Sequence, residues 1–391
     1  MLGFVSVPTN IIFEQMNRAG YQISVLKPGF LGCTDIEIEN RLRDTSLSLL
    51  RSVERFGYLG MRPCTSTHLN VDEFGCRFVP SEPSFTRSVR QPTIPYQKLI
   101  HVYGGSTTLG SHVSDNETLP YYLMNVLSQA TSVVSPVVVN CGGNNHTSLH
   151  CALHLLDDCL NGRIPDIAIF INGWNDAMHA DGGGDGIVPF LDACLMRSQS
   201  SQSEDMTIRE VRDSLSNHSR NSYRSRSLNL EIRNEDLWFY KNRYESAIEI
   251  VNSMERVFGV KPFMFVEPSP FIACRSDQDL MPKVRELNSA TPMIKAIFQR
   301  IDQSGIQSVL EKTSKNRIST CLMRCEQDKQ VFPLFIDETH FTPAFNSFLG
   351  AKISKEIAPF LNKRSSRKRK LAQKFSPKKP VDDRDYIYPL W

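Results

Sequence analysis

Short apolar runs alternate with segments of helical periodicity through the middle of the sequence, and this alternation constrains the fold most. The first run, Leu99–Tyr103, precedes a helical segment at Leu119–Ala130, and a second run, Val137–Asn140, precedes another at 147–160. A third run follows at Ile167–Ile171. Strands that alternate with helices are typical of a parallel sheet covered by helices on both faces. We therefore predict an α/β fold.

The pattern resumes further along the chain. Helical spacing at Glu235–Phe258 precedes a short apolar strand at Phe263–Val266, which stops at Glu267. We expect a further helix at Met293–Lys312 and a closing helix at Pro343–Leu361. The chain thus predicts four or more parallel strands with helices between them.

The flanking regions lack this alternation. Residues 1–95 contain seven prolines and one helix-like segment, Ile36–Phe56. We interpret them as an N-terminal extension that packs against a main domain at 96–361. A polar Ser/Arg-rich insertion at about 178–235 interrupts that domain, and we leave open whether it is a lid or only a solvated loop. Residues 362–391 form a basic tail.

Composition narrows the classes of function. A hydrophobic content of 40% and a charged content of 22% are those of an ordinary globular protein. The net charge of +3 is small and comes from the basic tail, which disfavours nucleic-acid binding as the main role. No run approaches the ~18 apolar residues of a transmembrane helix, and the N-terminus lacks the basic start of a secretory signal, so we expect a cytoplasmic protein.

Cysteine and histidine side chains are possible metal ligands in this sequence. The ten cysteines are scattered, and the nearest pair, Cys321 and Cys325, has no second pair beside it, so we expect reduced thiols. His146, His150 and His154 lie four residues apart and would share one helical face. That face could bind a metal, but a partly exposed polar face is the simpler reading, and we expect no metal or organic cofactor.

Four predicted strand exits carry polar residues suited to catalysis. These exits are the segments GGSTT at 104–108, NCGGNNHTS at 140–148, GWND at 173–176 and DETH at 337–340. In open parallel sheets, active sites form at the carboxyl ends of the strands, so residues from all four segments should meet there.

The residue types at these exits are those of a hydrolytic triad with an oxyanion hole. A serine hydroxyl such as that of Ser106 needs a base within hydrogen-bond reach. Asp337 precedes His340 by three residues, so that one turn can present both and the carboxylate can orient the imidazole. The Asn175 amide could donate to a developing oxyanion. Each segment alone is common; their order and their placement at successive strand ends make the pattern informative.

These blocks resemble those of the GDSL or SGNH hydrolases, a family named for Ser, Gly, Asn and His in that chain order. The resemblance covers about 98–361. It implies a three-layer α/β/α sandwich with a parallel, flavodoxin-like sheet and ester hydrolysis through an acyl-enzyme on Ser106. It also implies that Ser106 donates its backbone N–H to the oxyanion, with Asn175 as the side-chain donor, His340 as the base and Asp337 as the carboxylate.

Two positions depart from the family pattern. Gly105 stands where the family usually has Asp, a position outside the catalytic chemistry. Asn145 stands where the family has the glycine whose N–H serves the oxyanion hole. Asparagine tolerates the left-handed backbone conformation better than most residues, so Asn145 can still aim its N–H inward, and Gly143 is the alternative donor.

Other interpretations remain open from sequence alone. Ser106 could be a helix N-cap, and Asn175 with Asp176 could form a simple turn. The chain could also be an acyltransferase, or a binding module that keeps the fold without activity. The substrate, an ester of a carbohydrate, a lipid or a small alcohol, carries no readable code, and the oligomeric state is equally open.

Overall fold

The computed structural model describes residues in ten segments between 29 and 361. The described residues are 29–30, 32–47, 51–53, 59–80, 98–130, 136–178, 234–268, 318–319, 334–336 and 339–361. The expected helix at Met293–Lys312, the tail at 362–391 and all but the ends of the expected insertion lie outside these residues.

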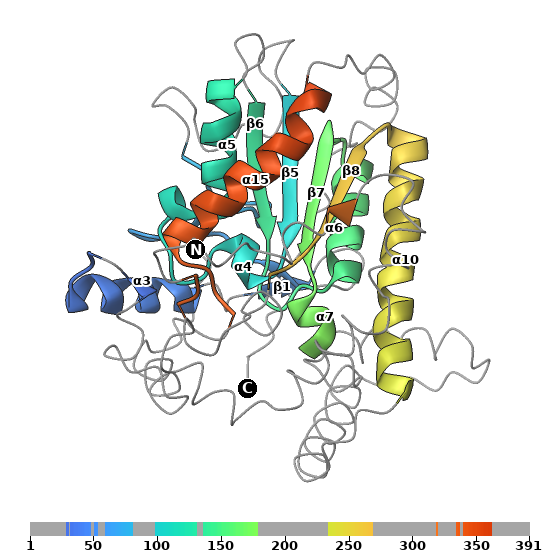
Figure 1. The fold of residues 1–391 in the computed structure, drawn as a ribbon. Helices are drawn as coiled ribbons and strands as arrows, with labels where there is room; N and C mark the ends of the chain where they lie inside the picture. Colours follow the sequence, from blue (N-terminus) through green and yellow to red (C-terminus); the bar gives the residue numbers. More distant parts are fainter. Residues whose placement is uncertain are drawn as a thin grey trace, which may run out of the picture.

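A parallel sheet of five strands forms the centre of the molecule (Figure 1). Its strands are β5 (Lys98–Gly104), β6 (Pro136–Gly142), β7 (Ile167–Asn172), β8 (Lys261–Val266) and β9 (Ile318–Ser319). They lie in the order β6-β5-β7-β8-β9, all parallel. Counted along the chain, this is the 2-1-3-4-5 order of flavodoxin-like sheets. The predicted α/β fold with a flavodoxin-like sheet is confirmed, although β9 had no counterpart in the sequence prediction.

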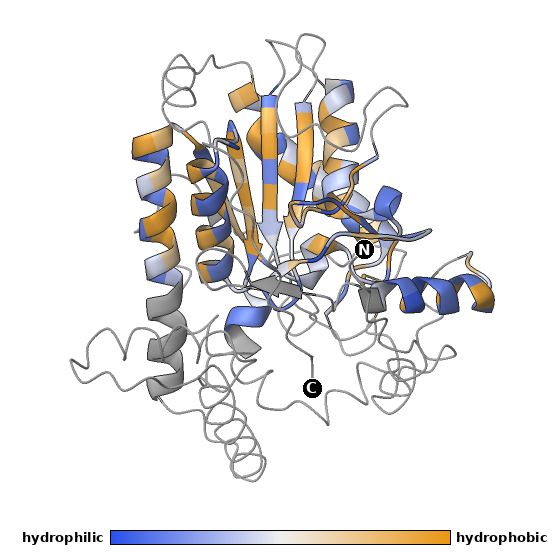
Figure 2. Cartoon of the chain, turned by 180° about the vertical axis from the view of Figure 1, so that it is seen from behind, coloured by the Kyte–Doolittle hydropathy of each residue, from blue (hydrophilic) through white to orange (hydrophobic). Residues whose placement is uncertain are grey.

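Helices cover both faces of the sheet. They are α5 (Leu119–Ala130), α6 (Ser148–Leu160), α10 (Asn234–Phe258) and α15 (Pro343–Leu361). Alternate residues of β5 point to opposite faces: Ile100 and Val102 join the core under α5 and α15, and Leu99 and Tyr103 join the core under α6 and α10. Both faces of the strands are accordingly apolar, and much of their length is coloured as hydrophobic in Figure 2. In the described part of the chain, no helix has an apolar stretch that could cross a bilayer.

The N-terminal region contains more regular structure than its prolines suggested. The helix expected at Ile36–Phe56 is shorter: α3 spans Asp35–Leu47. Beyond it, β1 (Arg51–Val53) pairs antiparallel with β2 (Leu59–Met61), and this backbone pairing is incompatible with a continued helix. A second hairpin follows from β3 (Cys64–Thr65) and β4 (Asn70–Val71).

Arg77 attaches this N-terminal region to the main sheet. Its backbone N–H donates to the Asn140 carbonyl of β6 over 2.9 Å. Its guanidinium group is buried, forms an ion pair with Asp115 at 2.7 Å, and donates to four backbone carbonyls, those of His68, Leu109, Gly110 and Val113. All five N–H groups of the side chain are therefore bonded.

We predict that Arg77→Met lowers the free energy of unfolding by about 3–5 kcal/mol, because it leaves Asp115 buried without its cation. Chemical denaturation followed by circular dichroism measures the change. Arg43→Met is the matched control: Arg43 is half exposed and forms a surface ion pair with Glu39 one helical turn away, so its loss should change the stability by no more than about 0.5 kcal/mol. Equal effects of the two substitutions would contradict the assignment.

Candidate active site

The first strand exit places Ser106 at the start of a short helix. The chain leaves β5 at Gly104, and α4 spans Ser106–Leu109 with Gly105 as its N-cap residue. Ser106 is thus the first helical residue and not the cap, which removes the capping explanation for this serine. A Cβ atom on Gly105 would lie 2.4 Å from Nδ2 of Asn175, so the close approach of that amide requires glycine here.

Ser106 meets His340 across 234 positions of sequence. The distance from Ser106 Oγ to Nε2 of His340 is 3.0 Å, and both residues are half-buried. The loop that carries His340 is closed by a bond from the Ile336 N–H to the His340 carbonyl, 2.7 Å, and by a bridge between Phe335 and Phe341. The structure therefore places a hydroxyl against an imidazole at the carboxyl end of the sheet.

Asp337, the expected carboxylate, lies outside the described residues, as does Glu338. The flanking residues Ile336 and Thr339 are described and fix both ends of this part of the loop. The role of Asp337 stays a prediction from its spacing to His340.

Asn175 lies beside Gly105, the residue before this serine. It belongs to α7 (Trp174–Met178), which follows β7 and lies at the same end of the sheet as α4 (Figure 1). Its side-chain nitrogen donates to the His146 carbonyl over 3.0 Å, and the amide contains a second N–H. The neighbouring Asp176 accepts bonds from the N–H and the hydroxyl of Ser148 and so caps α6.

The second strand exit distinguishes between the two expected backbone donors. The Gly143 N–H donates to the Gly104 carbonyl over 3.0 Å. This hydrogen bond joins the first two strand exits and uses the Gly143 N–H. Asn145 has φ = 58°, the left-handed conformation anticipated for it from the sequence. These two observations favour Asn145 over Gly143 as a donor toward the site.

Glu267 is a site residue that the sequence analysis did not single out. It follows β8 and is 2% exposed. One carboxyl oxygen accepts a short hydrogen bond from the Thr107 hydroxyl, and the other accepts the Trp174 N–H over 3.1 Å. Burial raises the pKa of Glu267 to about 7, and these two bonds together with the nearby His340 oppose the rise. Its position at a strand exit was the available signal.

His112 is a second residue that the sequence did not reveal. Its ring packs edge-on against that of His340, with 4.6 Å between the ring centroids. The residue is buried and has φ = 72°, a conformation rare for a histidine. Its backbone N–H donates to the Thr45 hydroxyl of α3 over 3.0 Å. The N-terminal region therefore contributes to the surroundings of the His340 ring.

We predict a pH-dependent stability contribution from Glu267. Between its ordinary pKa of 4.5 and its raised pKa of about 7, the folded protein retains a proton that the unfolded chain has released. The free energy of unfolding should therefore fall as the pH rises through this window, by about 3 kcal/mol from this group.

Urea denaturation of the wild type and of Glu267→Gln at pH 5 and pH 8 tests this. The wild type should lose about 3 kcal/mol more than the variant between the two pH values, because glutamine does not titrate. An identical pH dependence in both proteins would show that the folded carboxyl titrates normally.

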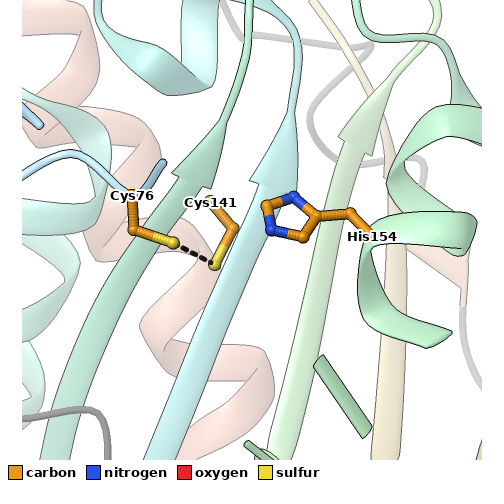
Figure 3. A group of neighbouring side chains, drawn as sticks. All are labelled: Cys76, Cys141 and His154. Atoms are coloured by element: carbon orange, nitrogen blue, oxygen red, sulfur yellow. Dashed lines mark hydrogen bonds between the residues drawn. The ribbon is translucent and has the colours of Figure 1, made fainter. Parts of the chain in front are cut away.

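Two groups of buried Cys, His and Asp side chains bring possible metal ligands together. Cys76, Cys141 and His154 converge in the core under α6 (Figure 3), and the two sulfur atoms are 3.4 Å apart. A second group, His101, Cys141 and Asp158, shares one cysteine with the first. Among the described residues each group offers three ligand atoms, whereas a buried structural zinc ion takes four.

Other bonds occupy much of this polar cluster. Asp158 accepts bonds from Tyr103 at 2.7 Å, from Arg163 at 2.7 Å and from His101 at 3.0 Å. On the helical histidine face, His150 Nδ1 accepts the Thr147 N–H and so caps α6, a structural role not foreseen for it. Within the described residues, the six cysteines form no disulfide bond.

Comparisons with known proteins gave structural matches alone. No protein-family model and no curated protein matches the chain. Among solved structures, it is similar to a lipase/acylhydrolase from Enterococcus faecalis at 16% identity, covering 69% of this chain and 100% of that one, with a TM-score of 0.36.

Two further similar structures come from other bacteria. A member of the lipolytic protein G-D-S-L family from Veillonella parvula is 12% identical over 66% of this chain and 97% of its own, with a TM-score of 0.34. An acetylxylan esterase from Geobacillus stearothermophilus is 14% identical over 69% of this chain and 97% of its own, also with a TM-score of 0.34.

Proposed function

We propose that this protein is a serine ester hydrolase of the SGNH type, with its catalytic domain at 96–361. The observation that carries the proposal is the 3.0 Å contact between Ser106 Oγ and His340 Nε2. A serine within hydrogen-bond reach of an imidazole is the arrangement that activates a hydroxyl as a nucleophile. The contact lies at the carboxyl ends of β5 and β7, where the strand order reverses direction and α/β proteins bind their ligands.

The proposed reaction has two stages. Ser106 Oγ attacks the ester carbonyl carbon while His340 Nε2 takes the hydroxyl proton, and the carbonyl oxygen becomes an oxyanion. His340 then gives that proton to the departing alcohol, leaving an acyl group on Ser106. A water molecule, deprotonated by His340, attacks this acyl-enzyme and releases the carboxylic acid with Ser106 restored. In this scheme Asp337 orients the imidazole.

Three donors are proposed for the oxyanion. They are the backbone N–H of Ser106, the second N–H of the Asn175 amide and the backbone N–H of Asn145. Asn175 is supported by its position against Gly105, and Asn145 by its left-handed backbone and by the commitment of Gly143 to the Gly104 carbonyl. The proposed substrates are carboxylic esters, either O-acetylated carbohydrates or lipid-like esters.

Ser106→Ala should abolish hydrolysis of p-nitrophenyl acetate and butyrate and prevent labelling by a fluorophosphonate probe, because both need the activated hydroxyl. Ser111→Ala is the matched control, since this buried serine lies on the same segment and its hydroxyl donates to the Asn144 side-chain oxygen over 3.4 Å. Circular dichroism should show both variants folded. Full activity of Ser106→Ala would refute the proposal.

The oxyanion donors can be tested separately. Asn175→Ala should lower kcat about 10²–10³-fold, the usual cost of losing one such donor. Asn145→Gly should leave kcat close to the wild-type value, because glycine keeps both the N–H group and the left-handed conformation. Steady-state kinetics at saturating substrate distinguishes these outcomes. A large loss in Asn145→Gly would instead implicate the asparagine side chain.

A further inference from the structure

Glu267 connects segments that follow different strands. Its own N–H donates to the Asn172 carbonyl at the end of β7 over 2.7 Å, which fixes its backbone beside the neighbouring strand exit. Its side chain accepts bonds from the Thr107 hydroxyl and the Trp174 N–H. A carboxylate that accepts one bond on each oxygen is held in a single orientation.

The two partners of this carboxylate are sequence neighbours of the two central site residues. Thr107 follows Ser106 in the first turn of α4, and Trp174 precedes Asn175 in α7. One buried side chain therefore connects the turn that contains the serine with the turn that contains the amide. The two bonded residues, Thr107 and Trp174, are 67 positions apart in the sequence.

We propose that Glu267 is a positioning residue, whose ionised carboxylate holds the serine turn and the Asn175 turn at their working separation and supports positive charge on His340. The proposal rests on the proposed function, since it assigns Glu267 a part in that reaction. It needs no direct contact between Glu267 and the substrate.

The ionised form is the one that fits the observed bonds. The Trp174 N–H can only donate, whereas the Thr107 hydroxyl can donate or accept, and it donates when its carboxyl partner is ionised. A proton on the oxygen that contacts Thr107 would reverse the direction of that bond, so the carboxyl group accepts both bonds only in its ionised form.

The groups around Glu267 determine the pH at which its carboxyl group ionises. Burial disfavours the anion, and the Asp176 carboxylate in α7 disfavours it further, whereas the nearby His340 favours it. The Cys151 thiol on α6 is near enough for the Glu267 charge to raise the pKa of that thiol. With a pKa of about 7, the carboxyl changes its charge within the range in which His340 must lose its proton to act as a base.

The attraction between Glu267 and His340 is reciprocal. An anion that is stabilised by a nearby imidazolium stabilises that imidazolium equally, and the proposed mechanism forms an imidazolium in the transition state. Neutralising Glu267 should therefore cost transition-state stabilisation as well as position.

The test is the pH profile of kcat between pH 5 and 9 for the wild type, Glu267→Gln and Thr107→Val, with p-nitrophenyl acetate as substrate. Glu267→Gln should lower kcat about 10- to 100-fold with little change in KM, as misplacement of reacting groups does. Its acid limb should move to lower pH, because the carboxyl no longer titrates and His340 loses the neighbouring negative charge.

Thr107→Val should move the acid limb in the opposite direction. It removes a hydrogen bond to the ionised carboxylate and keeps the charge, so the pKa of Glu267 rises and the limb shifts to higher pH. This variant also keeps the proposal testable if Glu267→Gln does not fold.

Asp166→Asn is the matched control. This carboxylate accepts the Leu99 N–H over 2.9 Å at the opposite, amino ends of the strands. It should affect stability without shifting the acid limb. Unshifted limbs in both Glu267→Gln and Thr107→Val would overturn the positioning role, while Ser106→Ala with full activity would overturn the proposed function itself.

Discussion

The position of His340 depends on the packing of α15 against α5. His340 stands three residues before α15, so the imidazole can reach Ser106 only if this helix is fixed against the sheet. The apolar face of α15 joins that of α5 in one core, through Phe345, Leu349 and Ile353. Gly350 allows the two backbones to approach, since a Cβ atom there would lie 2.9 Å from the Leu123 nitrogen. Apolar packing does not itself orient polar groups. Here it fixes the helix that follows His340 and so holds the imidazole within hydrogen-bond distance of Ser106.

The N-terminal region supports the same loop from the other side. Ile336, the residue before Asp337, packs with Phe30, Ile38, Leu42 and Val113 in a small separate core. Arg41 of α3 pairs with Glu117, whose carbonyl accepts a bond from Asn346 of α15 over 3.0 Å. The His340 loop is therefore clamped between a helix that follows it and a helix from the start of the chain, which argues against treating the N-terminal region as a dispensable addition.

Sequence reasoning succeeded where a pattern was local. The strands β5 to β8 follow from short apolar runs, and the polar residues at their exits follow from the rule that parallel strands end at one edge. Ser106, Asn175 and His340 could therefore be named together, and the structure brings His340 to Ser106 and Asn175 to the adjacent Gly105. The left-handed backbone of Asn145 was also anticipated, because few residue types adopt it.

Features that depend on distant partners could not be predicted in this way. The sequence allowed Gly143 as a backbone donor to the oxyanion. In the structure its N–H donates to the Gly104 carbonyl, a contact between two strand exits that the sequence does not indicate. Glu267 stood at a strand exit in the sequence, but its partner Thr107 lies 160 positions earlier. Nothing local marks His112 as a neighbour of His340, and the two-residue strand β9 is too short for any periodicity.

Glu267 is difficult to explain by stability alone. A pKa raised from 4.5 to about 7 means that its ionised form is less stable in the fold than in water, by about 3 kcal/mol, despite two hydrogen bonds and a nearby imidazole. A neutral side chain of similar shape would avoid most of this cost above neutral pH. Residues with such perturbed ionisation concentrate at functional sites, where a charge is needed in a position that folding does not favour. This charge lies between the serine turn and the amide turn and close to His340, on which the proposed reaction would place a positive charge.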